Sequence, residues 1–221
     1  MAHPLIEAPP VEERRIPMTY DEWLAWSGEG TRSEWVDGEA IVFMPTKEPH
    51  AGASWFLATL LGLYAQGLGL GRVFASELEM RLRPGRSSRQ PDVLFIAKAN
   101  LGRLTVDRLE GPADLVVELI SDDSVTRDRV VKFREYAAAG IPEYWIFDPR
   151  PGKQTSDFFR LDVRGDYQAV PLDADGRYRS QVLPGFWLDP TWLWQVPEPD
   201  VLTLLASIAA DVFRPPLARP G

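Results

Sequence analysis

The chain has 221 residues, a length typical of one large domain or two small ones, and its 45% hydrophobic and 25% charged residues match an ordinary soluble globular protein. Its 32 acids against 24 bases give a formal net charge of −8, which excludes a protein that is basic throughout and restricts any contact with DNA to a local surface. The absence of cysteine excludes disulfides, thiolate zinc sites and cysteine nucleophiles, and it suits a reducing compartment.

The first elements can be predicted from caps and turns. Residues 1–17 contain four prolines and no periodicity, which is typical of a tail. The pattern Thr-x-x-Glu at 19–22 is a capping box and predicts a short helix to about residue 26. Asp37 and Gly38 lie between β-prone residues of the segment 33–43, which predicts a hairpin with a type I′ turn because both central residues need positive φ.

An uncharged segment follows at 51–71, and it is long enough to cross a bilayer as a helix. It contains five glycines, however, and the alternation of Gly and Leu at 67–71 should end a helix near residue 66. We therefore predict a buried helix over about 50–66. The N-terminus also lacks the pattern of a signal peptide, so we expect a cytoplasmic protein with no membrane association.

The middle of the chain predicts a sheet covered by a helix. Residues 73–83 alternate between apolar and charged, as in one half-exposed strand, whereas 92–97 and 114–120 are apolar on both faces, as in central strands. A helix from about 122 to 139 should end at Gly140, and a further core strand is expected at 143–148. This strand, helix, strand order implies a parallel crossover.

The last part of the chain changes to short β segments. We interpret residues 151–210 as a β extension of the same domain, with a final helix near 200–210, and residues 211–221 as a C-terminal tail. The sequence thus predicts an α/β (α+β) fold: a single domain over 18–210 whose core spans about 18–150. A tryptophan cluster could be core or a homodimer surface, and we favour core. It consists of Trp187, Trp192 and Trp194.

Two acidic residues in apolar strands are candidates for a site. Glu118 lies within Leu-Val-Val-Glu-Leu-Ile, where an unpaired buried charge would cost several kcal/mol, so a metal ion, a salt bridge or protonation must offset that cost. Asp92 begins the strand at 92–97 after Pro91, a position that by itself is more typical of a turn. If the two strands are adjacent, the two carboxylates could bind one hard cation such as Mg²⁺.

Lys132 is the third candidate, because the chain uses arginine for twenty of its 24 basic residues. A lysine can mark a place that needs a compact, titratable ammonium group to orient or deprotonate water. The alternative is a surface ion pair with Asp128, four residues earlier on the same helix. Tyr136, four residues later, could pack in the core or contact a phosphate.

Together these segments carry a resemblance. The chain resembles the Uma-type restriction endonuclease family, within the PD-(D/E)XK nuclease-like superfamily, over roughly residues 18–205. The resemblance is carried by Glu-Trp-Val-Asp-Gly-Glu at 34–39, Arg-Gln-Pro-Asp-Val-Leu-Phe-Ile at 89–96, Gly-Pro-Ala-Asp-Leu-Val-Val-Glu-Leu-Ile-Ser at 111–121, and the segment from Arg-Asp-x-x-x-Lys-x-x-x-Tyr to Gly-Ile-Pro-Glu-Tyr-Trp-Ile-Phe-Asp-Pro at 127–149.

The resemblance implies a restriction-endonuclease-like mixed sheet flanked by helices. It implies further that Asp92 and Glu118 bind Mg²⁺ or Mn²⁺, that the backbone carbonyl of Leu119 is another metal ligand, and that Glu34 completes the acidic cluster. The sequence departs from the superfamily pattern at Ile120, which stands where a lysine is expected two residues after the glutamate. In proteins similar to this one the lysine is thought to come from the following helix, and Lys132 is the matching position.

The implied activity is metal-dependent hydrolysis of phosphodiester bonds, with DNA as the substrate. The alternative is a non-catalytic interaction module that retains the nuclease fold, which the missing lysine and the negative charge favour. Arginines near the site could contact flanking phosphates, or they could form a solvated strand face paired with Glu77 and Glu79. These arginines are Arg72, Arg81, Arg83, Arg86 and Arg89.

Overall fold

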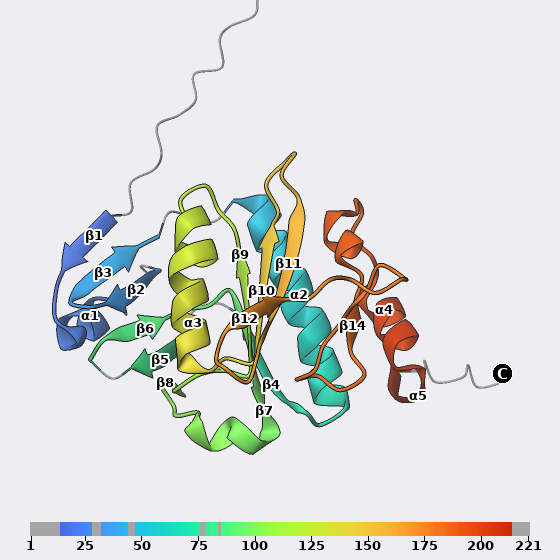
Figure 1. Cartoon of the computed structure of the whole chain (residues 1–221), viewed down its shortest axis with the longest axis horizontal. Helices are drawn as coiled ribbons and strands as arrows, with labels where there is room; N and C mark the ends of the chain where they lie inside the picture. Colours follow the sequence, from blue (N-terminus) through green and yellow to red (C-terminus); the bar gives the residue numbers. More distant parts are fainter. Residues whose placement is uncertain (1–13, 28–31, 44–46, 76–77, 84, 214–221) are drawn as a thin grey trace, which may run out of the picture.

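The computed structural model describes residues 14–27, 32–43, 47–75, 78–83 and 85–213, and these form two six-stranded sheets, a two-stranded ribbon and the helices around them (Figure 1). The first sheet has the order β1 (Arg14–Pro17), β3 (Glu39–Val42), β2 (Ser33–Val36), β6 (Ser87–Arg89), β5 (Glu79–Arg83) and β8 (Arg108–Glu110). The second sheet has the order β12 (Tyr167–Ala169), β11 (Thr155–Leu161), β10 (Glu143–Asp148), β9 (Leu115–Leu119), β7 (Val93–Ala97) and β4 (Gly71–Ala75).

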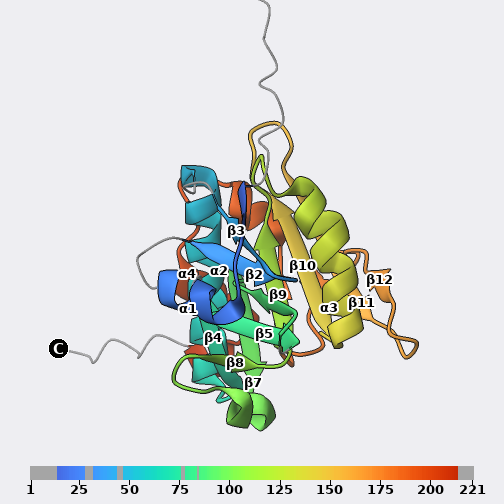
Figure 2. The same cartoon turned by 90° about the vertical axis from the view of Figure 1, so that its left-hand side faces the viewer.

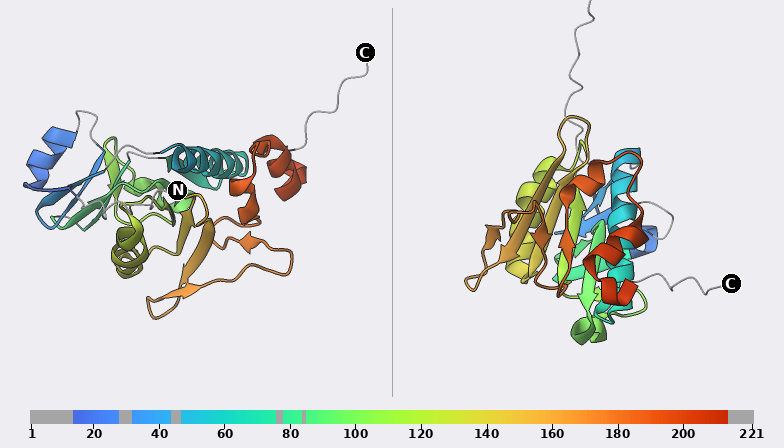
Figure 3. Two further views of the ribbon diagram at one scale, coloured as in Figure 1. Left: turned by 90° about the horizontal axis from the view of Figure 1, so that it is seen from above. Right: turned by 90° about the vertical axis from the view of Figure 1, so that its right-hand side faces the viewer.

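Helices lie on both faces of the second sheet, as the view from above shows (Figure 3). The α-helices are α1 (Tyr20–Ser27), α2 (Glu48–Gly67), α3 (Phe133–Ala139), α4 (Val201–Ile208) and α5 (Ala210–Phe213). Two short 3₁₀ helices, η1 (Lys98–Arg103) and η3 (Pro190–Trp194), and a π-helical turn, η2 (Arg127–Lys132), complete the helical elements of the described ranges. The predicted mixed fold of sheets flanked by helices is confirmed.

The central strands divide their side chains between two cores. In β9, Leu115 and Val117 pack in the cluster that contains the buried face of α2, whereas Val116 packs in the cluster that contains Tyr136 of α3. Because side chains alternate along a strand, Glu118 lies on the α3 side. This alternation directs the one acid of β9 toward the helix that carries Lys132.

The predicted parallel crossover is confirmed. Strands β9 and β10 pair in parallel, with Glu118 opposite Ile146, and η2 and α3 connect them across the sheet. Gly140 ends α3 with φ +83°, the left-handed position predicted for it, where residues with a Cβ are strained. The crossover fixes the helix over the strand that bears the acid.

The predicted hairpin is also confirmed, and it builds the first sheet. Asp37 and Gly38 have φ +47° and +90° between β2 and β3, as a type I′ turn requires. In Figure 2 the first sheet lies in front of the second, between α2 and α3. Strand β2 of this sheet carries Glu34, which is fully buried.

The prediction for residues 73–83 was wrong. The single strand predicted at 73–83 is two strands in different sheets, β4 beside β7 and β5 beside β6, with residues 76–77 outside the described ranges. Glu79, predicted on an exposed face, is buried and accepts hydrogen bonds from Tyr20 and Ser88, each at 2.6 Å. The alternation was read correctly as β structure, but it carries no information on which strand pairs with which.

The other differences concern short segments. Arg14–Pro17, predicted as tail, forms β1 against β3, and the short strands β6 and β8 were not predicted. Residues 1–13 and 214–221 of the predicted tails lie outside the described residues, while α5 extends to Phe213. None of the helices in the described part of the chain is long and apolar enough to cross a membrane.

The predicted β extension continues the second sheet. Strand β11 pairs antiparallel with β10, and β12 pairs with β11, while β13 (Tyr178–Arg179) and β14 (Trp187–Leu188) form the separate ribbon. Trp192 is buried in the cluster under α2, and Trp187 and Trp194 pack against that cluster. The interpretation of the tryptophans as core is therefore confirmed.

Candidate active site

Asp92 and Glu118 lie side by side at one end of the second sheet. Val93 pairs with Val117 in the antiparallel register of β7 and β9, so Asp92 follows in register beside Glu118. The backbone N–H of Leu119 donates to Asp92 Oδ2 at 2.8 Å. Asp92 and Glu118 are only 3% and 2% exposed, so both carboxyl groups depend on protein partners for their stability.

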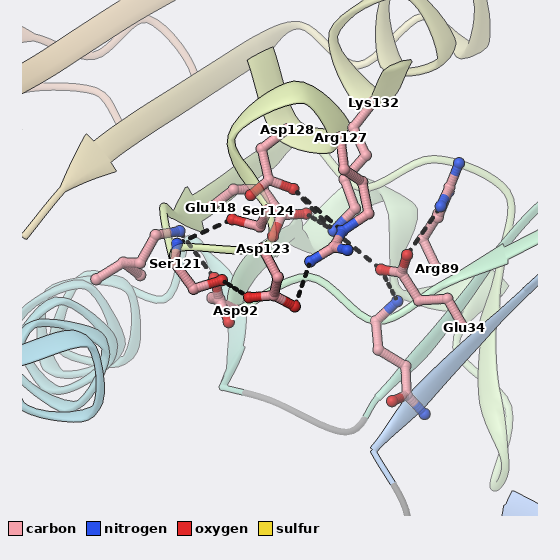
Figure 4. Close-up of polar contacts among 12 residues, drawn as sticks. Glu34, Arg89, Asp92, Glu118, Ser121, Asp123, Ser124, Arg127, Asp128 and Lys132 are labelled. Carbon is pink, nitrogen blue, oxygen red and sulfur yellow. Dashed lines mark hydrogen bonds and ion pairs between the residues drawn. The ribbon is translucent and has the colours of Figure 1, made fainter. Parts of the chain in front are cut away.

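The ammonium group of Lys132 contacts one acid from each of the two sheets. Its Nζ lies 2.9 Å from Glu118 Oε1 on β9 and 2.9 Å from Glu34 Oε1 on β2, and 3.4 Å from Asp128 Oδ1 one helical turn earlier (Figure 4). Lys132 and Asp128 are 3% and 2% exposed, so the alternative of a surface ion pair is wrong. The structure brings together Lys132 and the acids at positions 34 and 118.

Arg89 holds Glu34 from the other side. Its Nη1 donates to Glu34 Oε2 at 2.8 Å, and its Nε donates to Glu135 Oε2 of α3 at 2.8 Å. The backbone N–H of Gln90 donates to Glu34 Oε1 at 3.1 Å. Arg89 is 1% exposed, so its guanidinium is used within the protein and presents no surface to a phosphate.

Tyr136 is fully buried, and its hydroxyl donates to Glu118 Oε1 at 2.7 Å. Like Arg89, it therefore contacts an acid of the site and not solvent. Arg89 and Tyr136 thus hold Glu34 and Glu118 in a fixed orientation through hydrogen bonds. From the sequence we expected these two residues to contact a phosphate instead.

Several residues of the site were not identified from the sequence. Arg32 donates to Asp92 Oδ1, and His50 Nε2 lies 3.3 Å from Asp92 Oδ2. The sequence signal for Asp128 was present, since it lies four residues before Lys132. Its burial could not be seen, because the residues on either side of it are both arginines, as on a solvated helix face. Arg32 and His50 carry no local signal, because they approach Asp92 only in the folded chain, from the residue before β2 and from α2.

A pocket of about 480 Å³ opens over these groups. Asp92, Glu118, Leu119, Asp128 and Lys132 all line it, whereas Glu34 does not. Its wall also contains basic side chains from four segments, which are Arg32, Lys47, Arg127, and Arg150 with Lys153. The pocket thus combines buried carboxylate oxygens, which could bind a cation, with several basic side chains in its wall.

The electrostatics of the acids differ. Burial raises the pKa of Glu34, but Lys132 and Arg89 outweigh burial and lower that pKa to about 2, so Glu34 is ionised. Burial also raises the pKa of Asp92, and the contacts with His50 and Arg32 outweigh it, which holds this pKa well below its ordinary value.

The pKa of Glu118 shifts in the opposite direction, and the pKa of its partner Lys132 is raised as well. Burial and the neighbouring acids Asp128 and Asp92 exceed the effect of Lys132 and raise the pKa of Glu118 to about 8. Burial lowers the pKa of Lys132, but the three acids around it prevail and hold its pKa above the ordinary value. Lys132 therefore remains protonated at neutral pH, so it can donate hydrogen bonds and stabilise negative charge but cannot act as a general base.

The donor set fits a hard divalent cation with a largely hydrated shell. Asp92 and Glu118 supply carboxylate oxygens in one pocket, and Leu119, whose N–H points to Asp92, directs its carbonyl toward the same edge of β9 because both groups of a strand residue point the same way. Asp128 Oδ1 is buried and without a hydrogen-bond donor in the described ranges. Magnesium commonly uses one or two carboxylates and several waters.

A cluster of three acids around one ion is not formed. Among the described residues there is no group of three or more His, Cys, Asp or Glu side chains arranged to hold a metal ion. Glu34 faces Lys132 and Arg89, so its position is that of a partner of Lys132. A metal site here would rest on Asp92, Glu118 and the Leu119 carbonyl.

Comparison with known proteins gives a family and a fold. A family model described as "Uma2: Putative restriction endonuclease" matches residues 18–191. A solved structure of a putative nuclease belonging to DUF820 from Anabaena variabilis ATCC 29413 superimposes with a TM-score of 0.65 at 18% sequence identity, and the match covers 80% of this chain and 98% of the other. At this identity the superposition shows the fold alone. No curated protein matches the chain.

Proposed function

This chain belongs to the Uma2 family of "putative restriction endonucleases", and from this premise we propose that it is a metal-dependent endonuclease that hydrolyses phosphodiester bonds of DNA. The observation that carries the proposal is the position of Lys132. Its Nζ lies 2.9 Å from Glu118, although the residue two positions after Glu118 is the apolar Ile120. A helix lysine thus supplies the ammonium group that the strand lacks.

Asp92, Glu118 and the carbonyl of Leu119 would hold Mg²⁺ or Mn²⁺ in the pocket. A bound metal ion would polarise the phosphate and lower the pKa of a bound water. Lys132, which stays protonated, would orient the attacking water and stabilise the charge that develops on the phosphate. Glu34, Arg89 and Tyr136 would position Lys132 and Glu118 through the hydrogen bonds described above.

The alternative is a non-catalytic module, and two observations favour it. Ile120 replaces the expected lysine, and protein cations occupy oxygens of Asp92 and Glu118. In the endonuclease a metal ion must compete with Arg32 for Asp92, which requires these ion pairs to rearrange. In the non-catalytic module the ion pairs are the final arrangement.

Incubation with supercoiled plasmid in Mg²⁺, in Mn²⁺ and in EDTA separates the two functions. We expect nicking or linearisation with either metal and none in EDTA, and loss of cleavage in Asp92→Asn and Glu118→Gln. Arg164→Ala, which removes an exposed arginine on the β11–β12 turn, is the control and should cleave like the wild type. Equal cleavage by both site variants would identify a contaminating nuclease. A cytoplasmic location and a homodimer stay predictions from the sequence.

A further inference from the structure

A second hollow, of about 330 Å³, lies between the β5–β6 turn and the outer face of α3. Three exposed arginines line it: Arg83 and Arg86 from the turn and Arg134 from the helix. We call it the arginine groove. It is separate from the active-site pocket, since Lys132 faces that pocket while Val131 and Arg134 of the same helix face the groove.

The five arginines expected near the site from the sequence differ in their surroundings. Arg81 is used within the protein, because its Nε and Nη2 donate to Glu110 at 2.9 and 2.7 Å. Arg72 lies over the ring of Phe74 at 4.7 Å, and Arg89 is buried. Of the five arginines, Arg83, Arg86 and the buried Arg89 line the groove, and only the first two are exposed there. The structure adds the exposed Arg134 from a distant part of the sequence.

The guanidinium groups of the groove are available to a ligand. In the ranges that the structure describes, neither Arg83 nor Arg134 has an acid within ion-pair distance, and Arg86 lies 3.9 Å from Asp37, with both side chains about 70% exposed. Such an exposed pair contributes little. The other acid of the groove, Glu135, already accepts two hydrogen bonds from Arg89. The groove therefore carries an excess of positive charge in a molecule whose net charge is −8.

A hydroxyl group in the groove also lacks a partner. Ser87 lines the groove, is 4% exposed, and its Oγ has no hydrogen-bond partner within the described part of the chain. Buried hydroxyls are normally hydrogen-bonded, so an unpaired one beside three guanidinium groups indicates a place for a ligand oxygen. Arginine and serine are a common pair of phosphate ligands on nucleic-acid-binding proteins.

We propose that the arginine groove binds a backbone phosphate of DNA, away from the phosphate that is cleaved; this inference rests on the proposed function. The connection runs through Arg89, which contacts Glu135 in the groove and Glu34 behind Lys132. The groove and the active-site pocket therefore lie on either side of one helix and one buried ion-pair chain. A DNA strand that crosses this edge would be held at two separate points.

The test measures binding without cleavage. A fluorescein-labelled DNA duplex is titrated with the full chain in EDTA, at several salt concentrations, and affinity is read by fluorescence anisotropy. We expect Arg83→Ala, Arg86→Ala and Arg134→Ala each to weaken binding several-fold, equally for unrelated duplex sequences, and to reduce the slope of log affinity against log salt by about one. Ser87→Ala should weaken binding in the same direction.

Arg164→Ala is the matched control, because it removes the same charge from an exposed position outside the groove. Equal affinity and salt slope in the groove variants, the control and the wild type would overturn the inference, as would a wild-type protein that does not bind the duplex. Wild-type binding that depends on the groove, without any metal-dependent cleavage, would contradict the proposed endonuclease and leave the groove assignment intact.

Discussion

Replacing Lys132 by Met tests the electrostatics of the site most sharply, because three buried acids share this one ammonium group. The methionine fills a similar volume, so the packing cost should be small and the change should report the charge. Glu34 keeps Arg89, whereas Glu118 loses its cation and keeps only the hydroxyl of Tyr136. The cost therefore falls mainly on Glu118 and Asp128.

The magnitude should depend on pH. Glu118 has a pKa of about 8 with Lys132 present, so at pH 5.5 it is protonated in the wild type and in the variant, and little charge is left unpaired at that position. We expect a loss of about 1–2 kcal/mol in the free energy of unfolding at this pH, from the hydrogen bonds removed. At pH 9 the wild-type carboxylate is ionised and paired, whereas in the variant Glu118 must stay protonated because it has no cation. The one pH unit between its wild-type pKa of about 8 and pH 9 adds about 1.4 kcal/mol to the loss.

Urea denaturation of the wild type and the variant at both pH values gives the two differences. Lys98→Met, a change at an exposed lysine on η1, is the control and should cost less than about 0.5 kcal/mol at either pH. A loss for Lys132→Met that is the same at pH 5.5 and pH 9 would refute the reasoning, because it would mean that Glu118 does not titrate between them.

Two further predictions concern the acids. Glu118 must release its proton to bind a cation, so Mg²⁺ affinity should rise as the pH increases from 6.5 to 8.5, with proton release measurable by calorimetry in buffers of different ionisation enthalpy; an affinity independent of pH would contradict the raised pKa. Glu34 has a folded pKa of about 2, below its ordinary value of 4.5, so its stabilising contribution of about 3 kcal/mol is complete above pH 4.5 and is lost as the pH falls toward 2. Glu34→Gln should therefore show a shallower loss of stability in acid than the wild type, and an unchanged acid profile would exclude Glu34 as an ionised partner of Lys132.

Much of the fold followed from local patterns in the sequence. The Asp37-Gly38 turn, the end of α3 at Gly140 and the apolar strands β7, β9 and β10 were all predicted, because each depends on the conformation or burial of neighbouring residues. The division of 73–83 into β4 and β5 could not be predicted, since an alternating pattern reports half-burial and not the sheet that a strand joins.

The residues of the candidate site differ in how far the sequence could indicate them. Glu118 and Lys132 could be identified because an acid within an apolar segment and a scarce residue type are both apparent in the sequence. The orientation of Glu34 and Arg89 was not visible, because their ion pair joins β2 to β6 across 55 positions of sequence. Arg32 and His50 meet Asp92 only through the packing of both sheets and α2, for which no local signal exists.

The central claim is that Lys132 serves the active site in place of the lysine absent at position 120. Single-turnover cleavage of plasmid in Mg²⁺ by the wild type, Lys132→Met and Lys132→Arg, at a pH where all three are folded by circular dichroism, tests it most directly. We expect metal-dependent cleavage by the wild type, a loss of at least about 10²-fold in Lys132→Met, and partial recovery in Lys132→Arg. Cleavage by Lys132→Met at the wild-type rate would contradict it.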